Sequence, residues 1–353
     1  MKKVKSLILD HLKKYPLSQP QDLFKFAYQS AFGCEHMISS EENLCRRIKE
    51  EYSSMNDVQN EAVVSLGDSF CRLPLSYLRH GLSPETLSKL FYLSSQKKGG
   101  GKEALSNIIF AINELSLEGK LPFDREYLRD ELCKWESDGY PAIHHSEVFR
   151  DEYSPAYRVI SKEYLPFLPL FENIDKRLKE KELNIAIEGG SAGGKTTLSC
   201  LLSTVYDCNV IHMDDFFLRP EQRTPQRFAE IGGNIDRERF LAEVLEPLKE
   251  GKEFSYQKFD CSTMSLGEWE RVSKKPLTII EGAYSMHPAF SDYYDFSVFL
   301  AVSTSLQKQR IEKRNPGKMA LRFFNEWIPL ERTYFEKTKT EERCDLVIQI
   351  DKN

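Results

Sequence analysis

The sequence lacks several features that would place it in other classes of protein. No segment approaches the roughly 20 consecutive apolar residues of a membrane-spanning helix, and the basic amino terminus carries an apolar run of only residues 7–9, which favours an amphipathic helix over a signal peptide. Lys and Arg total 49 against 54 Asp and Glu, and the net charge of -5 argues against a broad surface for nucleic acid or anionic membranes. We expect a cytoplasmic protein without either partner.

Cysteine and histidine spacing gives no sign of a metal centre. The eight cysteines are scattered and none forms a C-x-x-C pair. The adjacent His144 and His145 are interpreted as a solvated or hydrogen-bonded loop pair. We therefore expect reduced, partly buried thiols and no zinc site.

The 353 residues predict two domains. Residues 1–165 show helical periodicity, as at Leu87, Leu90 and Phe91, and predict a mostly helical domain of unknown role. Residues 166–183 are interpreted as a linker followed by a charged helix over 172–182. Residues 184–353 alternate strand and helix patterns, which is typical of a parallel sheet flanked by helices. The predicted fold class is therefore α/β, preceded by a helical domain.

Within the second domain, individual elements are predicted by their apolar runs. The candidate strands are 184–188, 210–213, 277–281, 296–302 and 346–350, and the candidate helices are 196–206, 237–250 and 306–314. Tyr256, Phe259 and Trp269 fall in an expected hairpin, where they either shape a substrate pocket or simply pack. Phe216 and Phe217 are expected to be core aromatics rather than a platform for stacking a base.

The clearest motif follows the first of these strands. Gly189, Gly194, Lys195 and Thr196 satisfy G-x-x-x-x-G-K-[ST], the pattern of a phosphate-binding loop (P-loop). Glycines let backbone N–H groups surround a phosphate, Lys195 supplies a positive charge, and the Thr196 hydroxyl is a ligand for Mg²⁺. The expected nucleotide-binding residues are Gly189, Gly190, Ser191, Ala192, Gly193, Gly194, Lys195, Thr196 and Thr197.

Acidic residues follow two further strands. Asp214 and Asp215 come directly after the predicted strand 210–213, and Glu281 is the last residue of the predicted strand 277–281. Ligands collect at the carboxyl ends of parallel strands, so we expect these carboxylates to lie beside the P-loop. A carboxylate there accepts a proton from an attacking hydroxyl or holds Mg²⁺. The cofactors implied are ATP and Mg²⁺.

Four segments together carry a family resemblance: GGSAGGKTT, MDDFF, NIDRERF and IIEGAYSMHP. In this order they resemble the uridine kinase/phosphoribulokinase family of P-loop kinases, which also includes nicotinamide riboside and pantothenate kinases. The resemblance covers about residues 183–350 and implies a P-loop kinase fold. It also implies transfer of a phosphoryl group to an alcohol.

The resemblance assigns roles to individual residues. It implies that Asp214 is the general base and metal-site neighbour, with Asp215 a metal or structural partner. Asp236 matches the family's sugar-binding aspartate, although Arg237, Glu238 and Arg239 replace the usual stretch after it. The expected substrate-binding set is Asp215, Asp236 and Tyr256, and the metal set is Thr196, Asp214 and Glu281.

The resemblance also implies lid arginines. Arg310 and Arg314 lie four residues apart on one helix face and are expected, with Lys195 and Asp214, to form the catalytic set. Arg322 is a third lid candidate.

Structural alternatives remain open for several of these residues. Asp214 and Asp215 are also explained as solvated strand-end carboxylates, and Asp236 as the cap of a helix beginning near residue 237. Arg310 and Arg314 are alternatively expected to pair with Glu312 or Glu336.

The amino-terminal domain has no counterpart in the resemblance. Polar and aromatic residues are interleaved in two segments, at Glu35 and His36 and again at His145, Arg150, Tyr153, Tyr157 and Arg158. Such groups form a ligand pocket, an interdomain contact or an ordinary helical surface. The domain is left with three roles: regulation, extension of the substrate pocket, or assembly of a homo-oligomer.

The leading hypothesis is an ATP- and Mg²⁺-dependent kinase that phosphorylates a hydroxyl of a small, nucleoside-like metabolite. The alternatives are a kinase for a sugar, vitamin or other alcohol, and a nucleotide-dependent regulatory protein. A GTPase is disfavoured because no N-K-x-D motif follows the P-loop.

Overall fold

The computed structural model describes residues 1–34, 41–55, 61–315 and 317–350. The chain forms two compact units, Met1–Glu172 and Asn173–Asn353. Each unit has its own buried core. Within the described residues no helix is long and apolar enough to cross a membrane.

The amino-terminal unit is mostly helical, as predicted. Its α-helices are α1 (Lys2–Lys14), α2 (Pro20–Phe32), α3 (Glu41–Ser54), α4 (Pro84–Ser95), α5 (Gly101–Leu117), α6 (Arg125–Ser137) and α7 (Glu147–Tyr153). The amino-terminal amphipathic helix is confirmed: α1 buries Ile8 and Leu12 and exposes Lys2, Lys3, Lys13 and Lys14. Side chains of Ser83, Asp124 and Ser146 cap α4, α6 and α7.

A small antiparallel sheet was not predicted in this unit. It contains β1 (Val64–Ser65), β2 (Phe70–Pro74) and β3 (Tyr157–Ser161), in the order β1-β2-β3. Arg72 pairs with Val159 across β2 and β3. All five residues of β2 are buried, so it lacks the polar–apolar alternation that marks a half-exposed strand.

The segment between the units differs from the prediction. Residues 162–167 form a 3₁₀ helix, and α8 (Leu168–Leu178) follows without a break. The predicted helix over 172–182 was therefore placed about one turn too late. Pro169 is tolerated because the first turn of a helix needs no N–H donor there. Leu168, Leu170 and Phe171 are buried, so the apolar stretch is part of a core rather than an exposed linker.

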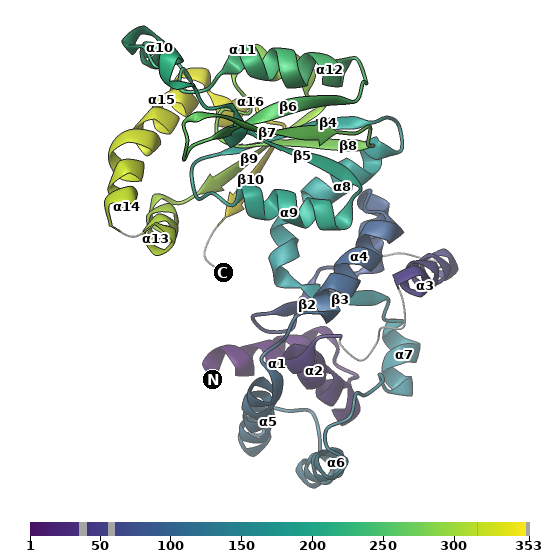
Figure 1. Ribbon diagram of the computed structural model, residues 1–353. Helices are drawn as coiled ribbons and strands as arrows, with labels where there is room; N and C mark the ends of the chain where they lie inside the picture. The colour runs from purple at the N-terminus through teal and green to yellow at the C-terminus, as the bar shows by residue number, and fades with distance from the viewer. Residues whose placement is uncertain (35–40, 56–60, 316, 351–353) are drawn as a thin grey trace. The chain divides into compact units, whose positions relative to one another are not determined.

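The carboxy-terminal unit is built on a five-stranded parallel sheet, which confirms the predicted fold class (Figure 1). Its order is β10-β9-β4-β8-β5. The strands are β4 (Leu183–Gly189), β5 (Cys208–His212), β8 (Leu277–Glu281), β9 (Phe296–Val302) and β10 (Leu346–Ile350). All five predicted strands are present, with ends shifted by at most a few residues. Helices cover both faces of the sheet (Figure 1).

The connecting elements follow the expected alternation. Residues after β4 form α9 (Lys195–Val205), and those after β9 form α13 (Thr304–Arg314). The remaining α-helices are α10 (Pro225–Ala229), α11 (Arg237–Phe240), α12 (Glu246–Lys249), α14 (Lys318–Arg322), α15 (Ile328–Thr338) and α16 (Thr340–Arg343). The expected hairpin is confirmed as β6 (Phe254–Asp260) with β7 (Ser265–Val272).

The predicted helix over 237–250 contains a π-helical turn. Residues Leu241–Leu245 separate α11 from α12 without a break in the helix. Pro247 has no N–H to donate, so one bond of an α-helical ladder is missing there, and the wider turn accommodates this defect.

The register of the sheet decides which side chains meet at its carboxyl edge. Glu281 at the end of β8 is paired with Ile187 of β4 on one side and with His212 of β5 on the other. The P-loop follows β4, and a 3₁₀ turn, Met213–Phe216, follows β5. Phe216 is completely buried and packs against Phe240 at 4.9 Å between ring centroids, as expected for a core aromatic.

Candidate active site

The P-loop connects β4 to α9 through a close turn. Gly189 has φ +149°, and a Cβ on it would lie 2.7 Å from the carbonyl oxygen of Leu300. Gly194 has φ +107° and caps α9. The Lys195 Nζ donates to the carbonyl oxygens of Gly189 (2.7 Å) and Gly190 (3.1 Å). The loop therefore curls around its own lysine at the start of a helix, where backbone N–H groups favour an anion.

A carboxylate from α15 contacts this loop. Glu331 is 5% exposed and accepts hydrogen bonds from the Ser191 N–H (2.9 Å) and the Ser191 hydroxyl (2.5 Å). Burial raises the pKa of Glu331, and the positive charge of Lys195 opposes that rise. Arg310 of α13 donates to the carbonyl oxygens of Ala192 (3.1 Å) and Gly193 (3.2 Å). One acidic and one basic side chain thus hold the outer part of the loop.

Glu281 joins the P-loop helix to β5. Its Oε1 accepts a hydrogen bond from the Thr196 hydroxyl at 2.9 Å and another from His212 Nδ1 at 2.6 Å. Burial raises the pKa of Glu281, but the His212 bond and the Lys195 charge outweigh it, so the net pKa lies below its usual value. The hydrogen bond to Glu281 correspondingly raises the pKa of His212. Glu281 is therefore an anionic acceptor beside the Thr196 hydroxyl.

The two aspartates after β5 have different surroundings. The Asp214 side chain is exposed. It has no hydrogen-bond or ion-pair partner among the described residues. Desolvation raises the pKa of its carboxyl, and the nearby Glu281 carboxylate adds to this rise. Asp215 accepts a hydrogen bond from the Tyr256 hydroxyl at 3.0 Å, and its carbonyl oxygen accepts one from Arg239. The Asp215 carboxylate is thus held by the Tyr256 hydroxyl, whereas the Asp214 carboxylate is available to a ligand.

Glu188, the last side chain before the P-loop, is completely buried. It accepts bonds from the N–H groups of Gly189 (2.9 Å), Tyr284 (3.2 Å) and Met286 (3.1 Å), and from the Tyr334 hydroxyl (3.1 Å). Burial raises the pKa of Glu188 to about 7 despite these donors. It ties the start of the P-loop to the segment after β8 and to α15.

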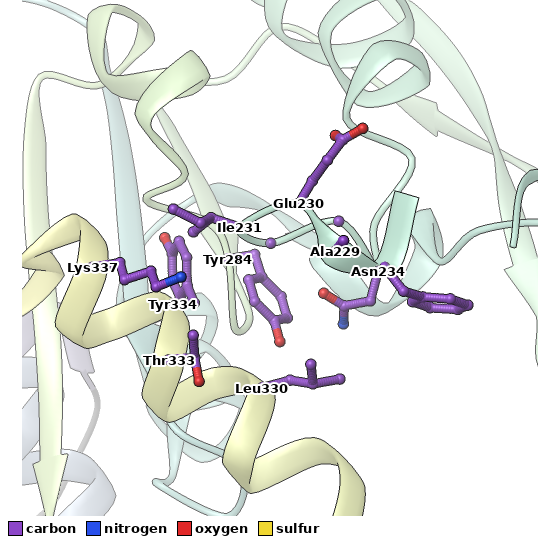
Figure 2. A pocket seen from close by; sticks show the side chains of 12 residues that line it. Ala229, Glu230, Ile231, Asn234, Tyr284, Leu330, Thr333, Tyr334 and Lys337 are labelled. Carbon is purple, nitrogen blue, oxygen red and sulfur yellow. The ribbon is translucent and has the colours of Figure 1, made fainter. Parts of the chain in front are cut away.

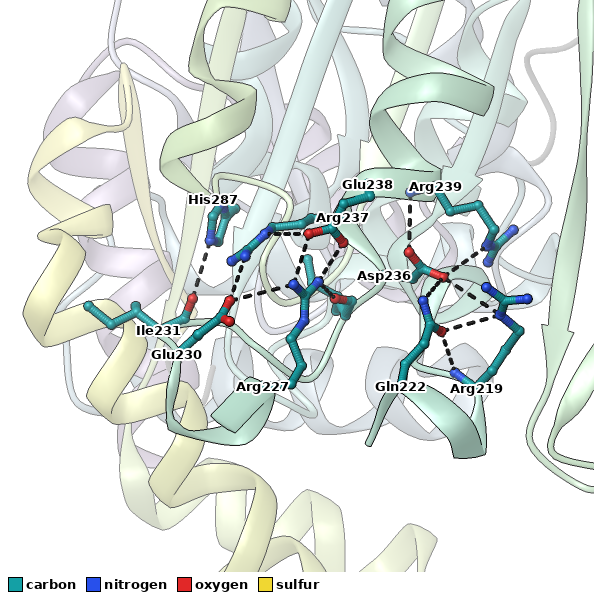
Figure 3. A network of polar contacts seen from close by, with 11 residues as sticks. Arg219, Gln222, Arg227, Glu230, Ile231, Asp236, Arg237, Glu238, Arg239 and His287 are labelled. Carbon is teal, nitrogen blue, oxygen red and sulfur yellow. Dashed lines mark hydrogen bonds and ion pairs between the residues drawn. The ribbon is translucent and has the colours of Figure 1, made fainter. Parts of the chain in front are cut away.

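Asp236 lies in a network of ion pairs (Figure 3). It caps α11 through the Arg239 N–H at 3.2 Å and accepts a 2.8 Å bond from the Gln222 side chain. Its carboxylate is also 4.0 Å from Arg219 Nε and 3.8 Å from Arg239 Nε. Asp236 therefore caps α11, as the structural alternative predicted. The same carboxylate also contacts Gln222, Arg219 and Arg239.

Arg237 and Glu238, which follow Asp236, pair with side chains of the preceding segment. Arg227 makes two bonds to Glu238, at 2.6 and 2.8 Å, and Arg237 contacts Glu230 at 2.5 Å (Figure 3). The Arg227 bond lowers the pKa of Glu238 to about 2. These side chains hold together the segment between β5 and α11.

A pocket of about 70 Å³ lies on the other side of this segment. It is lined by residues 228–234, by Tyr284 and by the α15 residues Leu330, Thr333, Tyr334 and Lys337. Figure 2 shows Tyr284 and Tyr334 side by side, with Asn234 and Leu330 on the side of Tyr284 opposite Tyr334. Its lining does not include Asp214 or Glu281.

The three arginines that were expected to form a lid differ in their contacts with the P-loop. Arg310 reaches it, as described above, whereas Arg314 at the end of α13 is exposed. Arg322 pairs with Glu326 at 3.3 Å and lies over the Trp327 ring. Glu312, an alternative partner for the arginines, lies 3.9 Å from Lys308.

Residues at the carboxyl edge fit a magnesium–nucleotide complex. The Thr196 hydroxyl and the Glu281 carboxylate already contact each other, and both are oxygen ligands of the kind that Mg²⁺ prefers. No group of three or more His, Cys, Asp or Glu side chains that could hold a metal is found in the described part of the chain. Mg²⁺ in nucleotide sites commonly uses one or two carboxylates together with phosphate oxygens, so the set present is adequate.

Sequence reasoning located the P-loop, Asp214, Asp215 and Glu281 but missed three contributors. His212 precedes the aspartate pair, and its position beside Glu281 depends on register. Glu188 is a charged residue inside an apolar strand, which was an available signal. No sequence signal pointed to Glu331, because it lies 140 residues after its partner Ser191. Glu35 and His36 lie outside the described residues.

Comparisons with known proteins give structural likeness only. No family model matches the sequence, and no curated protein matches it. Solved structures that are similar include a possible uridine kinase from Bacillus stearothermophilus, at 21% identity and a TM-score of 0.38, covering 51% of this chain and 99% of that chain. A shikimate kinase from Acinetobacter baumannii with shikimate is 18% identical, with a TM-score of 0.30, covering 50% and 88%. A deoxyadenosine kinase from M. mycoides with bound dATP is 16% identical, with a TM-score of 0.25, covering 47% and 90%.

Proposed function

We propose that the chain is an ATP- and Mg²⁺-dependent kinase that phosphorylates a hydroxyl of a small metabolite. The observation that carries this proposal is the free carboxylate of Asp214 at the same sheet edge as the P-loop and the Thr196–Glu281 pair. A nucleotide switch needs the loop and the metal ligands. Binding of a nucleotide by such a switch does not require an additional carboxylate that accepts a proton.

In the proposed reaction, the P-loop N–H groups and Lys195 bind the phosphates of ATP. Lys195 would exchange its carbonyl partners, Gly189 and Gly190, for phosphate oxygens. Thr196 and Glu281 would hold Mg²⁺, which neutralises negative charge on the phosphates.

Asp214 would orient the acceptor hydroxyl and accept its proton, so that the oxygen attacks the γ-phosphorus. The bond between that phosphorus and the oxygen bridging it to the β-phosphate breaks, and ADP leaves. The raised pKa of Asp214 brings this carboxyl closer to the range in which a general base is effective. Catalysis then consists mainly of positioning and electrostatic stabilisation.

A nucleoside-like acceptor is the more specific proposal, and it rests on the sequence resemblance around Asp236. This carboxylate would have to release Gln222 before it could accept bonds from a sugar diol. The alternative acceptor is a sugar, vitamin or other alcohol. The ion pairs among Arg227, Arg237 and Glu238, where the resemblance departs from the family pattern, favour keeping this alternative.

The test is an acceptor screen with the purified protein. Mg²⁺·ATP is combined with panels of nucleosides, sugars, sugar alcohols and vitamins, and ADP release is followed. With the acceptor so identified, Asp214→Asn should lower kcat about a hundredfold or more, the usual range for loss of a general base, and should leave the affinity for a fluorescent ATP analogue within a few-fold.

Asp207→Asn is the matched control, because Asp207 pairs with Lys275 just before the opposite end of β5. It should leave both measurements unchanged. Full acceptor-dependent turnover by Asp214→Asn would reject Asp214 as the base. Tight ATP binding without turnover on any acceptor would instead favour the regulatory alternative.

A further inference from the structure

A second polar cluster lies within the amino-terminal unit. Its centre is Arg72 on β2, which is 1% exposed. The Arg72 Nε donates to Gln29 of α2 at 2.8 Å, and its guanidinium lies 4.8 Å from the centre of the Tyr157 ring on β3. Both Nη atoms are buried and have no hydrogen-bond partner among the described residues. The cluster therefore contains a cation whose two terminal nitrogens are unpaired.

The acidic group of the cluster does not neutralise Arg72. Asp22 of α2 is completely buried, but its carboxylate accepts four bonds from other donors. These are the N–H of Gln19 (2.9 Å), the N–H and hydroxyl of Ser146 (3.0 and 2.6 Å) and Nδ1 of His145 (2.8 Å). Lys25, also buried, adds a second positive charge and donates to the carbonyl oxygen of Ile143 at 3.0 Å. The balance of the cluster is therefore positive.

His145 and Tyr157 form an ordered chain with Asp22. A carboxylate only accepts hydrogen bonds, so the Nδ1–H of His145 donates to Asp22, and its Nε2 accepts from the Tyr157 hydroxyl at 2.8 Å. Both ring nitrogens of His145 are thus occupied, and neither is left for the Arg72 Nη atoms.

His11 of α1 adds a second unpartnered group. It is 2% exposed and stacks on Phe26 at 4.6 Å, and neither ring nitrogen has a hydrogen-bond partner in the part of the chain that the structure describes. Burial lowers the pKa of His11 to about 2, and the charge of Arg72 contributes to that shift. A neutral imidazole offers one donor and one acceptor, so His11 can bond a ligand next to Arg72 without adding charge.

Unpaired polar groups of this kind are costly. Leaving a buried charged donor unsatisfied destabilises a protein, and the great majority of buried polar groups are paired. A guanidinium with two free terminal nitrogens matches the two oxygens of a carboxylate or phosphate group. We propose that the amino-terminal unit binds a small molecule through an oxyanion, a carboxylate or a phosphate group, held by the Nη atoms of Arg72 with His11 beside them.

The proposal is tested by anion-dependent stabilisation of the full-length protein. Because the P-loop also binds phosphate, all variants carry Lys195→Ala to weaken that response. Thermal unfolding is followed as sodium phosphate or sodium succinate is added, with ionic strength held constant by sodium chloride. The probes distinguish the two sources of the oxyanion: stabilisation by phosphate alone indicates a phosphate ester, and by succinate alone a carboxylate.

Arg72→Met is expected to weaken this anion response about tenfold or more, the effect of losing a charged hydrogen bond. Without added anion, Arg72→Met should be as stable as the parent or more so, because it removes an unpaired buried charge. Arg46→Met is the matched control, since Arg46 is 69% exposed in the same unit. It should retain the full response.

Equal anion responses in the Arg72→Met protein and its parent, or no response to either probe, would overturn the proposal. If Arg72→Met does not fold, the wild-type protein decides the question by NMR. The chain has seven histidines, and the ring signals of His11 should move as anion is added in the presence of saturating Mg²⁺·ADP. An unmoved His11 signal would equally reject the site.

Discussion

At the scale of single residues, the candidate active site contains carboxylates with opposite surroundings. Glu188 is enclosed by four donors, whereas Asp214 is exposed and has no partner among the described residues. Glu281 lies between these extremes, since His212 and Thr196 both donate to one of its oxygens. Glu188 is suited to holding the backbone and Asp214 to meeting a ligand.

His212 gives a prediction of pH dependence. Its pKa is raised because Glu281 accepts its Nδ1–H at 2.6 Å. A raised folded-state pKa means that the pair's contribution to stability is complete below pH 6.5, the ordinary value, and is lost as the pH rises through the higher value. NMR titration of the histidine rings should place His212 above pH 6.5.

Glu281→Gln should lower the titration midpoint of His212, because a neutral amide does not favour the imidazolium as a carboxylate does. A His212 midpoint that is the same with and without Glu281 would show that the pair is not formed in solution.

At the scale of secondary-structure elements, α15 acts on the P-loop through Glu331. This buried carboxylate occupies the Ser191 N–H and attracts Lys195, and both groups are expected to bind phosphate. Glu331→Gln removes the like charge while keeping an acceptor for Ser191. It should therefore tighten ATP binding by roughly threefold to tenfold, corresponding to about 1 kcal/mol of repulsion removed.

The measurement is titration of a fluorescent ATP analogue into each protein. Glu336→Gln on the same helix is the control, since Glu336 is exposed, and its affinity should equal that of the wild type. Weaker binding by Glu331→Gln would mean that Glu331 mainly positions Ser191 for the nucleotide.

Helix boundaries and short strands depended on contacts that are distant in sequence. Residues 166–183 were expected to begin as a linker, yet Leu168, Leu170 and Phe171 are buried and the helix starts at Leu168. β2 was missed because Arg72 and Pro74 interrupt its apolar pattern. Such a strand is stabilised by pairing with β3, and local propensity does not report that pairing.

At the scale of the whole molecule, two compact units with separate cores predict separable stability. Calorimetry of the full-length protein should show two unfolding transitions, or one asymmetric transition that fits two components. Mg²⁺·ATP should raise the unfolding temperature of only the component that belongs to the P-loop unit, because the ligand binds its folded state.

Lys195→Ala should abolish most of that ATP-induced shift and leave the other component in place, whereas Lys308→Ala, on exposed α13 surface, should preserve it. A single symmetric transition that moves as a whole with ATP would contradict independent units.

The sequence alone determined the α/β class, all five strands of the parallel sheet and the P-loop, because periodicity and the glycine–lysine pattern are local. It also placed Asp214 and Glu281 at strand ends. Tertiary structure alone decided that His212 and Thr196 share one oxygen of Glu281, that Glu331 contacts Ser191, and that the Arg72 Nη atoms have no partner. These facts depend on sheet register and on packing between residues that are far apart in the chain, and burial then sets the charge state of each group.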